Sequence, residues 1–385
     1  RDLIPERGNR FVVLIRADEP AGPGQGAEAF VSLLNAYRGR TFAGAPPAPG
    51  DLDTVIFTSG TTGESEGIPY THRQLVHAVR AIARAFHVLP VGFESLCWLP
   101  LSNLFQRIVN LCAVERAALL TFIPSPHQLM EAVPAVRPTL LIGVPRFFEK
   151  VEAGVQKSIA ERPRWVRALF RAAQATGTIY QRSRSSGHKA RFVLWPLFVI
   201  LDWAVLRAVR ERFGGRLRFL VSGAAPLGLK TMEFFEGLGL LVLEAYGTSE
   251  NAIPLAMNRP WSFRFGTVGR PLGPNEVEIA SDHEVMVKGP SLFAGYWAGA
   301  TPPPRFEGAF YRTGDEGRWE NGGFLRLIGR RSEFLKTSTG RRVTPGPIEQ
   351  WFKELPFVDQ AVVLGNGRKG PALLVTLDAQ ALGAS

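Results

Sequence analysis

Short apolar runs alternate along the chain with turns rich in Gly, Ser and Pro, and each turn leads into a helical segment. This strand–turn–helix alternation is typical of parallel βαβ units, and continuous apolar strands suit a sheet covered on both faces. Ligands gather at the carboxyl ends of such strands, so we expect the turns to converge on one cleft, although each turn alone also fits an ordinary βα loop. The five runs are Thr54–Phe57, Leu96–Leu99, Leu140–Ile142, Leu217–Val221 and Leu240–Leu243.

The spacing of apolar residues changes along the chain and predicts boundaries between domains. The spacing of apolar residues predicts a helix over 72–87 and a mostly helical, basic insert over 148–212, whose middle, RSRSSGHK, is typical of a loop. After Trp261, short alternating segments predict strands, and a later Gly/Pro-rich loop leads into a helix near Pro347 and two further strands. We therefore expect a remnant of an N-terminal subdomain at 1–50, an α/β core at 51–260, a β-rich subdomain at 261–332 and an incomplete C-terminal domain at 333–385.

Composition restricts the class of protein. The chain has 385 residues, of which 45% are hydrophobic and 21% are charged, and these globular values exclude a disordered chain. Its two cysteines, Cys97 and Cys112, exclude a disulfide framework and cannot alone form a tetrahedral zinc site. So few cysteines favour a reducing compartment, and we expect a cytoplasmic location.

The net charge of +11 favours anionic partners, such as nucleotide phosphates, anionic lipid or an acidic carrier. The sequence has neither zinc-finger spacing nor the aromatic-basic signature of a single-strand binder, so we expect no nucleic-acid partner. The basic insert also carries Trp195, Phe198, Trp203 and Leu206. These residues predict either peripheral contact with the anionic inner face of a membrane or a helix buried in the core, and the apolar run is too short to span a bilayer.

The turn after the first apolar run, Thr58–Gly63, has the chemistry of a phosphate cradle. Glycines let the backbone turn tightly and present N–H groups to an anion, and hydroxyl groups add donors. The Gly-Lys-Ser/Thr ending of a Walker A loop is missing from this turn. By itself, the turn fits either phosphate binding or a flexible loop.

Five motifs in one order resemble those of the adenylate-forming superfamily, which includes acyl-CoA synthetases, luciferases and peptide-synthetase adenylation domains. They are FTSGTTGESEG, SGAAPL, EAYGTSE, YRTGDEG and LIGRRSEF. The long-chain fatty acid–CoA ligase branch is indicated by WLPLSNLFQRIVN, GVPRFFEKV and the helical insert. The resemblance implies an α/β fold: an N-terminal domain of mostly parallel sheets with covering helices and a small β-barrel-like subdomain, then the start of a small α+β C-terminal domain.

The resemblance also assigns roles around an ATP molecule. It implies that the Tyr246 ring stacks on adenine, that Asp315 binds the ribose, and that Glu250 binds Mg²⁺, which prefers hard oxygen ligands. Ser249 would contact the transferred phosphate, and Arg330 would fix ribose and phosphate. The other implied contacts are to the phosphates (Thr58, Ser59, Gly60, the catalytic Thr61, Thr62 and Gly63), to the adenine and nucleotide (Gly223, Ala224, Ala225, Gly247 and Thr248) and to the thiol half-reaction (Gly340).

The residues alone leave other interpretations open. Asp315 also fits a residue in a turn, and Glu250 also fits a cap at the start of a helix. Tyr246 could lie in the apolar core, and Arg330 could be a solvated charge at the end of a strand.

The resemblance to the family also implies a reaction. It implies attack of a long-chain fatty carboxylate on the α-phosphate of ATP with loss of pyrophosphate, followed by attack of the coenzyme A thiol on the acyl-adenylate.

Two substitutions and the chain ends depart from the family pattern. Glu66 stands where a lysine is usual, and Asn103 stands where a histidine is usual. Ser385 also precedes the expected position of the adenylation lysine, so we expect a chain truncated at both ends with weak or absent adenylation. Two alternatives to a coenzyme A ligase stay open: a non-catalytic nucleotide- or acyl-binding module, and a ligase that acylates a carrier protein.

Overall fold

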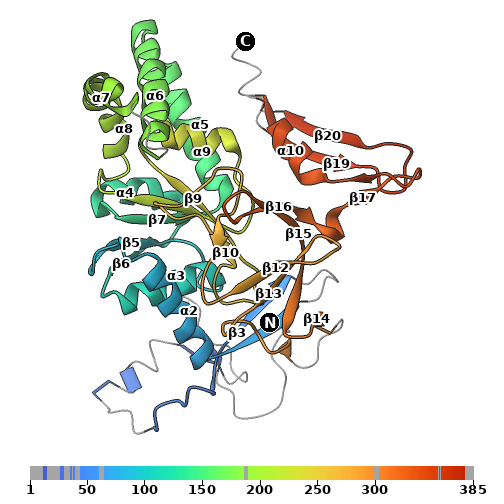
Figure 1. Cartoon of the computed structure of the whole chain (residues 1–385). Helices are drawn as coiled ribbons and strands as arrows, with labels where there is room; N and C mark the ends of the chain where they lie inside the picture. Colours follow the sequence, from blue (N-terminus) through green and yellow to red (C-terminus); the bar gives the residue numbers. More distant parts are fainter. Residues whose placement is uncertain are drawn as a thin grey trace. The chain divides into compact units, whose positions relative to one another are not determined.

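The computed structural model describes residues 12–14, 27–29, 35–36, 38–39, 44–59, 65–185, 190–297, 303–353, 355 and 357–377. The chain divides into two compact units, Arg1–Ala48 and Pro49–Ser385. The first unit contains a parallel pair of strands, β1 (Val12–Leu14) and β2 (Ala27–Ala29). The second contains the elements from β3 onward (Figure 1). The finer boundaries expected inside the second unit stay predictions.

A seven-stranded sheet forms the centre of the second unit. Five of its strands run parallel in the order β9–β8–β7–β5–β6, and β10 and β11 extend it antiparallel beyond β9. The predicted α/β class with a mostly parallel sheet is therefore confirmed. The strands are β5 (Glu94–Cys97), β6 (Leu119–Phe122), β7 (Leu140–Gly143), β8 (Phe219–Ser222), β9 (Val242–Tyr246), β10 (Ala256–Met257) and β11 (Arg270–Pro271).

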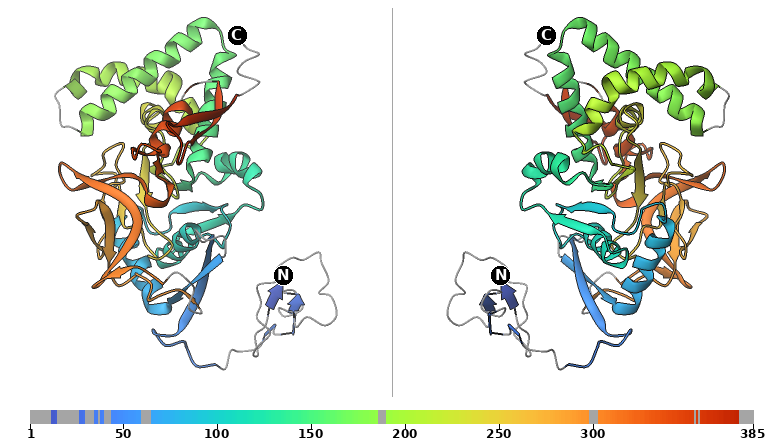
Figure 2. Two further views of the ribbon diagram at one scale, coloured as in Figure 1. Left: turned by 90° about the vertical axis from the view of Figure 1, so that its right-hand side faces the viewer. Right: turned by 90° about the vertical axis from the view of Figure 1, so that its left-hand side faces the viewer.

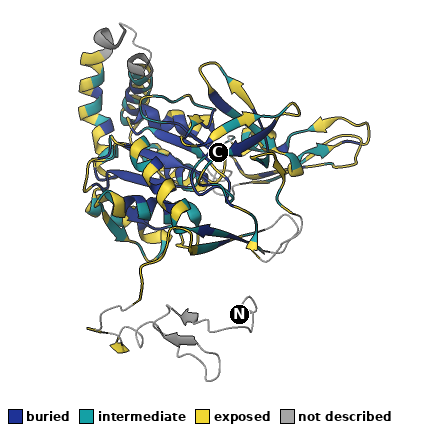
Figure 3. Cartoon of the chain, turned by 60° about the horizontal axis from the view of Figure 1, so that its bottom comes forward, coloured by how far each residue is buried: buried dark blue, intermediate teal, exposed yellow. Residues whose placement is uncertain are grey.

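Alternate residues of the central strands face opposite helical layers, which explains their unbroken apolar sequence. Ile142 and Val221 pack in one cluster with Val109 of α3, whereas Leu141 and Leu220 pack in another with residues of α4, α5 and α9. Figure 3 shows buried strands and exposed outer faces on the helices. The covering helices are α2 (His72–Ala85), α3 (Leu104–Glu115), α4 (Leu129–Val136), α5 (Pro145–Ala160) and α9 (Leu229–Gly237).

The first apolar run belongs to a hairpin. β3 (Leu52–Ser59) pairs antiparallel with β4 (Ser65–Thr71), so the prediction that this run is a parallel βαβ strand is wrong. The helix predicted next begins at His72, as expected. Thr71 starts it through a capping box, because its Oγ1 accepts the Gln74 N–H at 3.4 Å and the Gln74 Oε1 accepts the Thr71 N–H at 2.8 Å.

The basic insert is helical. After α5 come α6 (Arg164–Ser185), α7 (Ala190–Leu201), a π-helical turn η2 (Asp202–Leu206) and α8 (Arg207–Glu211). Figure 2 shows α6 and α7 side by side. The first four residues of the predicted loop RSRSSGHK continue α6, so that prediction is wrong there, and its last four residues lie outside the described part. Two arginines in these four residues favour the helix because arginine has a high helix propensity.

An antiparallel sheet follows, as the alternating pattern predicts. Its strands are ordered β12–β13–β15–β14, with β16 paired to β15. Beyond it, a 3₁₀ turn, η4 (Arg331–Glu333), leads to two small hairpins and one helix. The elements are β12 (Glu276–Ile279), β13 (Glu284–Lys288), β14 (Phe306–Glu307), β15 (Phe310–Glu320), β16 (Phe324–Arg330), β17 (Leu335–Lys336), β18 (Arg342–Val343), α10 (Pro345–Lys353), β19 (Val358–Leu364) and β20 (Ala372–Leu377).

Two glycines let α6 approach α9. A Cβ atom on Gly177 would lie 2.2 Å from the carbonyl oxygen of Gly237, and one on Gly237 would lie 2.8 Å from the Gln174 Cγ. A side chain at either position would therefore force the helices apart. The insert is attached to the core through this close contact.

We expect Gly177→Ala to lower the free energy of unfolding by about 1–3 kcal/mol, the usual cost of overpacking. Gly154→Ala is the matched control, because a Cβ there meets nothing within 4 Å and alanine is the better helix former. Urea unfolding of both variants measures the difference. Equal stability of the two variants would contradict the close contact.

Candidate active site

The loop after β8 lies at the carboxyl edge of the central sheet. The Gly223 N–H donates to the Gly143 carbonyl at 3.2 Å, and Ala224 holds a left-handed conformation with φ of 73°. Ala224 and Ala225 are exposed, so their backbone is open to a ligand. The loop is fixed at its far end, where the Leu227 N–H donates to Glu244 Oε1 at 3.1 Å.

Glu244 is a buried acid that sequence reasoning missed. The sequence feature that could have indicated it is a single carboxylate within the apolar strand VLEAY. Burial raises the pKa of Glu244 to about 7, although the Leu227 N–H and Arg326 act in the opposite direction. The carboxyl therefore holds the loop between Gly223 and Leu227 at an electrostatic cost.

Tyr246, Asp315 and Arg330 form one hydrogen-bonded chain. The Tyr246 hydroxyl donates to Asp315 Oδ2 at 2.7 Å and to Thr313 Oγ1 at 3.3 Å, and the Arg330 Nε donates to Asp315 Oδ1 at 3.2 Å. Asp315 is only 5% exposed, and burial raises its pKa while Tyr246 and Arg330 lower it. Three predicted site residues from two sheets thus meet. Tyr246 also belongs to the main apolar core, so stacking of its ring on adenine stays a prediction.

Glu250 lies beside a group of tyrosines that sequence reasoning did not find. The Tyr296 hydroxyl donates to Glu250 Oε1 at 3.0 Å and lies 3.3 Å from the hydroxyl of Tyr311. The Tyr70 hydroxyl donates to the carbonyl of Ser249. Burial, reinforced by the Glu250 charge, raises the pKa of all three tyrosines, so they stay donors at neutral pH. Tyr70 thus fixes Ser249, and Tyr296 fixes Glu250 from a segment more than two hundred residues away from Tyr70.

A cavity of about 410 Å³ joins this edge of the sheet to the space under α2 and α3. Its polar end is lined by Thr58, Gly223, Ala224, Gly247, Thr248, Ser249 and Arg330. Two buried oxygens on its wall, Thr248 Oγ1 and Asn251 Oδ1, have no hydrogen-bond partner among the described residues. Unsatisfied oxygens here suit a ligand that brings its own donors.

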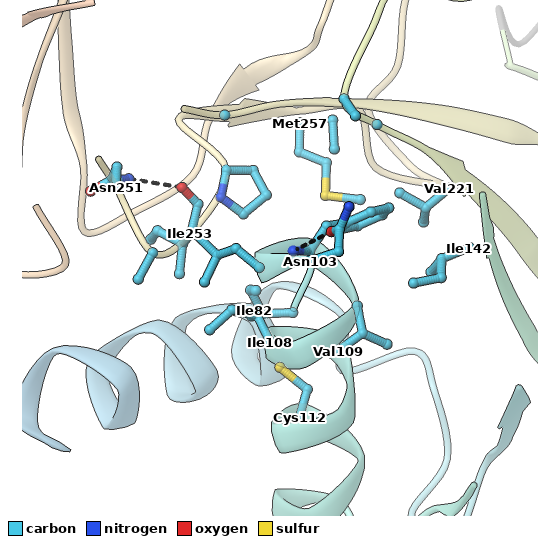
Figure 4. Close-up of a pocket in the computed structure, with 18 of the residues that line it drawn as sticks. Ile82, Asn103, Ile108, Val109, Cys112, Ile142, Val221, Asn251, Ile253 and Met257 are labelled. Atoms are coloured by element: carbon cyan, nitrogen blue, oxygen red, sulfur yellow. Dashed lines mark hydrogen bonds between the residues drawn. The ribbon is translucent and has the colours of Figure 1, made fainter. Parts of the chain in front are cut away.

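The inner part of the cavity is apolar and runs along the strands of the sheet. Ile142 and Val221 lie toward its polar end, and Leu140 and Phe219, at the starts of β7 and β8, toward its inner end. Four residues of strand span about 10 Å. Other apolar lining residues, from α2, α3 and the segment between α2 and β5, are Ile82, Phe86, Leu89, Phe93, Ile108, Val109 and Cys112, and the charged Arg116 follows α3. Figure 4 shows Ile82, Ile108, Val109 and Cys112 at this wall. Burial raises the pKa of Cys112 to about 12, so the thiol is neutral.

The two departures from the family pattern both lie at this site. Asn103 lines the cavity and caps α3, because its Oδ1 accepts the Phe105 N–H at 2.9 Å and the Gln106 N–H at 3.4 Å. Glu66 is half-buried opposite Thr58, and its charge raises the pKa of Tyr296. Among the described residues, no arginine or lysine forms an ion pair with Glu66.

Some predicted site residues are not brought together here. Gly60, Thr61, Thr62 and Gly63 lie outside the described residues, as does the side chain of Ser59. Gly340, with φ of 81°, lies in the exposed turn between β17 and β18 and does not line the cavity. Among the described residues, no three His, Cys, Asp or Glu side chains form a metal cluster.

Sequence comparison establishes the family. The profile described as AMP-binding enzyme matches residues 8–297, and that of the AMP-binding enzyme C-terminal domain matches residues 333–385. The chain belongs to the AMP-binding enzyme family. The resemblance to the adenylate-forming superfamily, drawn from the order of five motifs, is therefore confirmed.

Among curated proteins, the chain is similar to ligases of fatty acids and coenzyme A. The long-chain-fatty-acid–CoA ligase FadD15 of Mycobacterium bovis is 33% identical over 334 residues, which are 86% of this chain and 55% of the relative. Fatty acyl-CoA synthetase B of Dictyostelium discoideum is 30% identical over 346 residues, 86% of this chain and 50% of the relative. The chain thus spans about half the length of these relatives.

Solved structures support the fold. ATP-bound MatB from Rhodopseudomonas palustris has a TM-score of 0.68 at 23% identity and covers 91% of this chain, with 64% of its own length matched. The O-succinylbenzoate coenzyme A synthetase MenE of Bacillus subtilis, in complex with AMP, has a TM-score of 0.64 at 20% identity over 86% of this chain and 60% of its own. The adenylate-forming fold is confirmed.

Glu244→Gln tests the cost of the buried carboxyl. The native pKa of about 7 exceeds the ordinary 4.5, so the folded state holds a proton that the unfolded chain releases, and stability falls as the pH rises from 4.5 to 7. Glutamine keeps the acceptor for the Leu227 N–H but has no proton that titrates. We therefore expect the loss of unfolding free energy between pH 4.5 and 7 to be about 3 kcal/mol smaller in the variant than in the wild type. Urea unfolding at several pH values measures it, with the exposed Glu131→Gln as control. An unchanged pH dependence would exclude a raised pKa at Glu244.

Proposed function

We propose that this protein activates a long-chain fatty acid with ATP and Mg²⁺ and transfers the acyl group to coenzyme A. One observation carries the proposal: a polar group of Tyr246, Asp315 and Arg330 adjoins a cavity whose inner part is apolar. An acyl-adenylate has the same division, with a polar nucleotide joined to a hydrocarbon chain. The names of the relatives, a long-chain-fatty-acid–CoA ligase and a fatty acyl-CoA synthetase, support a fatty acid as the substrate.

The nucleotide would bind at the polar end. Asp315 has two oxygens in a fixed direction because Tyr246 and Arg330 hold one each, so its remaining lone pairs suit the two ribose hydroxyls. The exposed backbone at Ala224 and Ala225 would lie against adenine. Arg330, which lines the cavity, would partly neutralise the phosphate charge that develops during transfer.

Glu250 would hold the magnesium ion. Tyr296 donates to Glu250 Oε1, and the ion would bind this carboxylate beside the tyrosine contact. Mg²⁺ commonly binds one or two protein carboxylates together with substrate phosphates, so this carboxylate fits it. When bound, the ion would supply positive charge at the triphosphate.

The reaction needs no nucleophile from the protein. The fatty carboxylate oxygen forms a bond to the α-phosphorus, and the bond to pyrophosphate breaks. The thiol of coenzyme A then adds to the acyl carbonyl, loses its proton to solvent and expels AMP. The chain's contribution is to orient the carboxylate and exclude water from the apolar cavity. A carrier-protein thiol is the other acceptor that fits this chemistry.

A second candidate function, binding without turnover, is favoured by Glu66. This acid is half-buried near Tyr296, and it stands where the family usually has a lysine. A negative charge there would not stabilise the charge that develops on the phosphates during transfer, so turnover would be lost before binding. Fatty-acid-dependent release of pyrophosphate supports the ligase, whereas binding of ATP without release supports this candidate. The expectation of weak adenylation stays a prediction.

Asp315→Asn should weaken Mg-ATP binding about tenfold or more, since hydrogen bonds to a charged group contribute about 1.5–3 kcal/mol. Isothermal titration calorimetry measures the affinity, with Glu278→Gln, an acid-to-amide change on an exposed position of β12, as the matched control. Equal affinities in the two variants, with both folded, would remove Asp315 from the nucleotide site.

Val109→Phe should fill the apolar part of the cavity. Because each buried methylene contributes about 0.8 kcal/mol, displacement of two methylenes lowers hexadecanoate affinity about tenfold, while octanoate changes little. Competition with a fluorescent fatty acid measures both. The control is Val114→Phe on the same helix, where valine is 76% exposed. Equal losses for both fatty acids would place the acyl chain elsewhere.

A further inference from the structure

An arginine stands at the inner end of the apolar cavity. Arg116 directly follows α3 and lines the cavity together with Leu89 and Phe93. Because Phe93 precedes β5, this end lies at the amino edge of the sheet, opposite the edge where the nucleotide would bind. The Arg116 N–H donates to the Cys112 carbonyl at 3.0 Å, and the Arg116 carbonyl accepts the Gly92 N–H at 3.0 Å. The backbone that carries this charged side chain is therefore fixed on both sides.

The guanidinium group of Arg116 has hydrogen-bonding capacity that the protein does not use. Its Nη2 donates to the Leu89 carbonyl at 2.6 Å, but its Nε is buried and has no hydrogen-bond partner among the described residues. The neighbouring acid, Glu115, is exposed, and no acid of the described residues forms an ion pair with Arg116. A buried N–H without an acceptor is costly, and a ligand that brings an acceptor removes this cost.

A second arginine shows what a purely structural role looks like at this edge of the sheet. The Arg218 Nη1 donates to the Val88 carbonyl at 2.6 Å, directly before the Leu89 carbonyl that Arg116 holds. The two arginines thus bind consecutive carbonyls of one segment. Arg116 lines the apolar cavity, whereas Arg218 does not. The position of Arg116 at the cavity therefore calls for an explanation beyond support of this segment.

The chemistry of the inner end favours an acyl chain that ends in oxygen. A fatty acid with a terminal methyl group leaves the Arg116 Nε–H without an acceptor. A terminal carboxylate carries acceptors only and a charge opposite to that of arginine, so it suits this group best. In a cavity without such a partner, the same carboxylate would be strongly disfavoured by the loss of its hydration.

We propose that Arg116 binds the remote carboxylate of an α,ω-dicarboxylic fatty acid and so extends the substrates of this site to that class. The inference rests on the proposed function, because it places the acyl chain in the inner cavity. The carboxylate that is activated would lie at the polar end beside Ser249, and the second would lie against Arg116. Arg116 is then a specificity residue and takes no part in the chemical steps.

Competition with a fluorescent fatty acid tests the proposal through the affinities of dodecanedioate and dodecanoate. Arg116→Met keeps an unbranched side chain without a donor, and it should lower the affinity for dodecanedioate relative to dodecanoate about tenfold or more. Arg218→Met is the matched control, since it removes the bond to the adjacent carbonyl, and it should change this ratio less than about twofold. An unchanged ratio in Arg116→Met, or an equal fall in both variants, would overturn the proposal.

The wild-type chain alone provides a second test, which does not depend on how well a variant folds. The strands fix the distance between the two ends of the cavity, so one chain length should fit best. Among decanedioate, dodecanedioate, tetradecanedioate and hexadecanedioate, we expect one diacid to bind at least as tightly as the monocarboxylic acid of the same length. Weaker binding of the diacid at every length would overturn the proposal.

These measurements separate the inference from the proposed function. Binding of the monocarboxylic acids together with rejection of every diacid would overturn the role of Arg116 and leave the acyl cavity in place. Failure of the wild-type chain to bind any of the monocarboxylic acids would contradict the acyl cavity itself, and with it both proposals.

Discussion

The hydrogen bond from Tyr246 to Asp315 is the contact on which the site depends. It joins the end of β9 in the parallel sheet to β15 in the antiparallel sheet, at 2.7 Å and out of contact with bulk water. A buried carboxylate needs partners, and Tyr246 and Arg330 supply them. Loss of either partner would leave a charge that the core cannot accommodate. Both sheets are thereby held in a fixed relation at the candidate nucleotide site.

The central sheet imposes a second constraint. Each inner strand must pack against helices on both faces, so its residues alternate between two apolar layers. On the side of α2 and α3, the layer is not filled, and the remaining space forms the inner cavity. The polar end of that cavity coincides with the carboxyl edge of the strands, where backbone N–H groups are open to ligands. The same sheet thus provides the candidate nucleotide site at its carboxyl edge and one wall of the apolar inner cavity.

The sequence predicted the parts of the site that local chemistry determines. Apolar runs located β5, β7, β8 and β9, and the motifs around Tyr246, Asp315 and Arg330 predicted residues that the structure brings together. The β3–β4 hairpin was predicted wrongly because an apolar run alone does not distinguish parallel from antiparallel pairing.

Other features depend on contacts between distant segments, which one sequence does not reveal. Tyr70, Tyr296 and Tyr311 meet near Glu250 although more than two hundred residues separate the first from the others. Glu244 was missed because an acid inside a strand is informative only when its burial is known. Trp195 and Trp203 are exposed, so a helix buried in the core, one of the two predictions for the insert, is wrong for them. The composition of the insert fits both a buried and a surface helix. No helix of the described residues is long and apolar enough to cross a membrane, as the short apolar run predicts.

A crystal structure of the chain with a non-hydrolysable acyl-adenylate analogue tests the central claim most directly. We expect the ribose on Asp315, the adenine against the loop at Ala224, and the alkyl chain beneath α2 and α3 beside Val109. Binding of the analogue at another surface, or an alkyl chain that leaves the inner cavity empty, would contradict it.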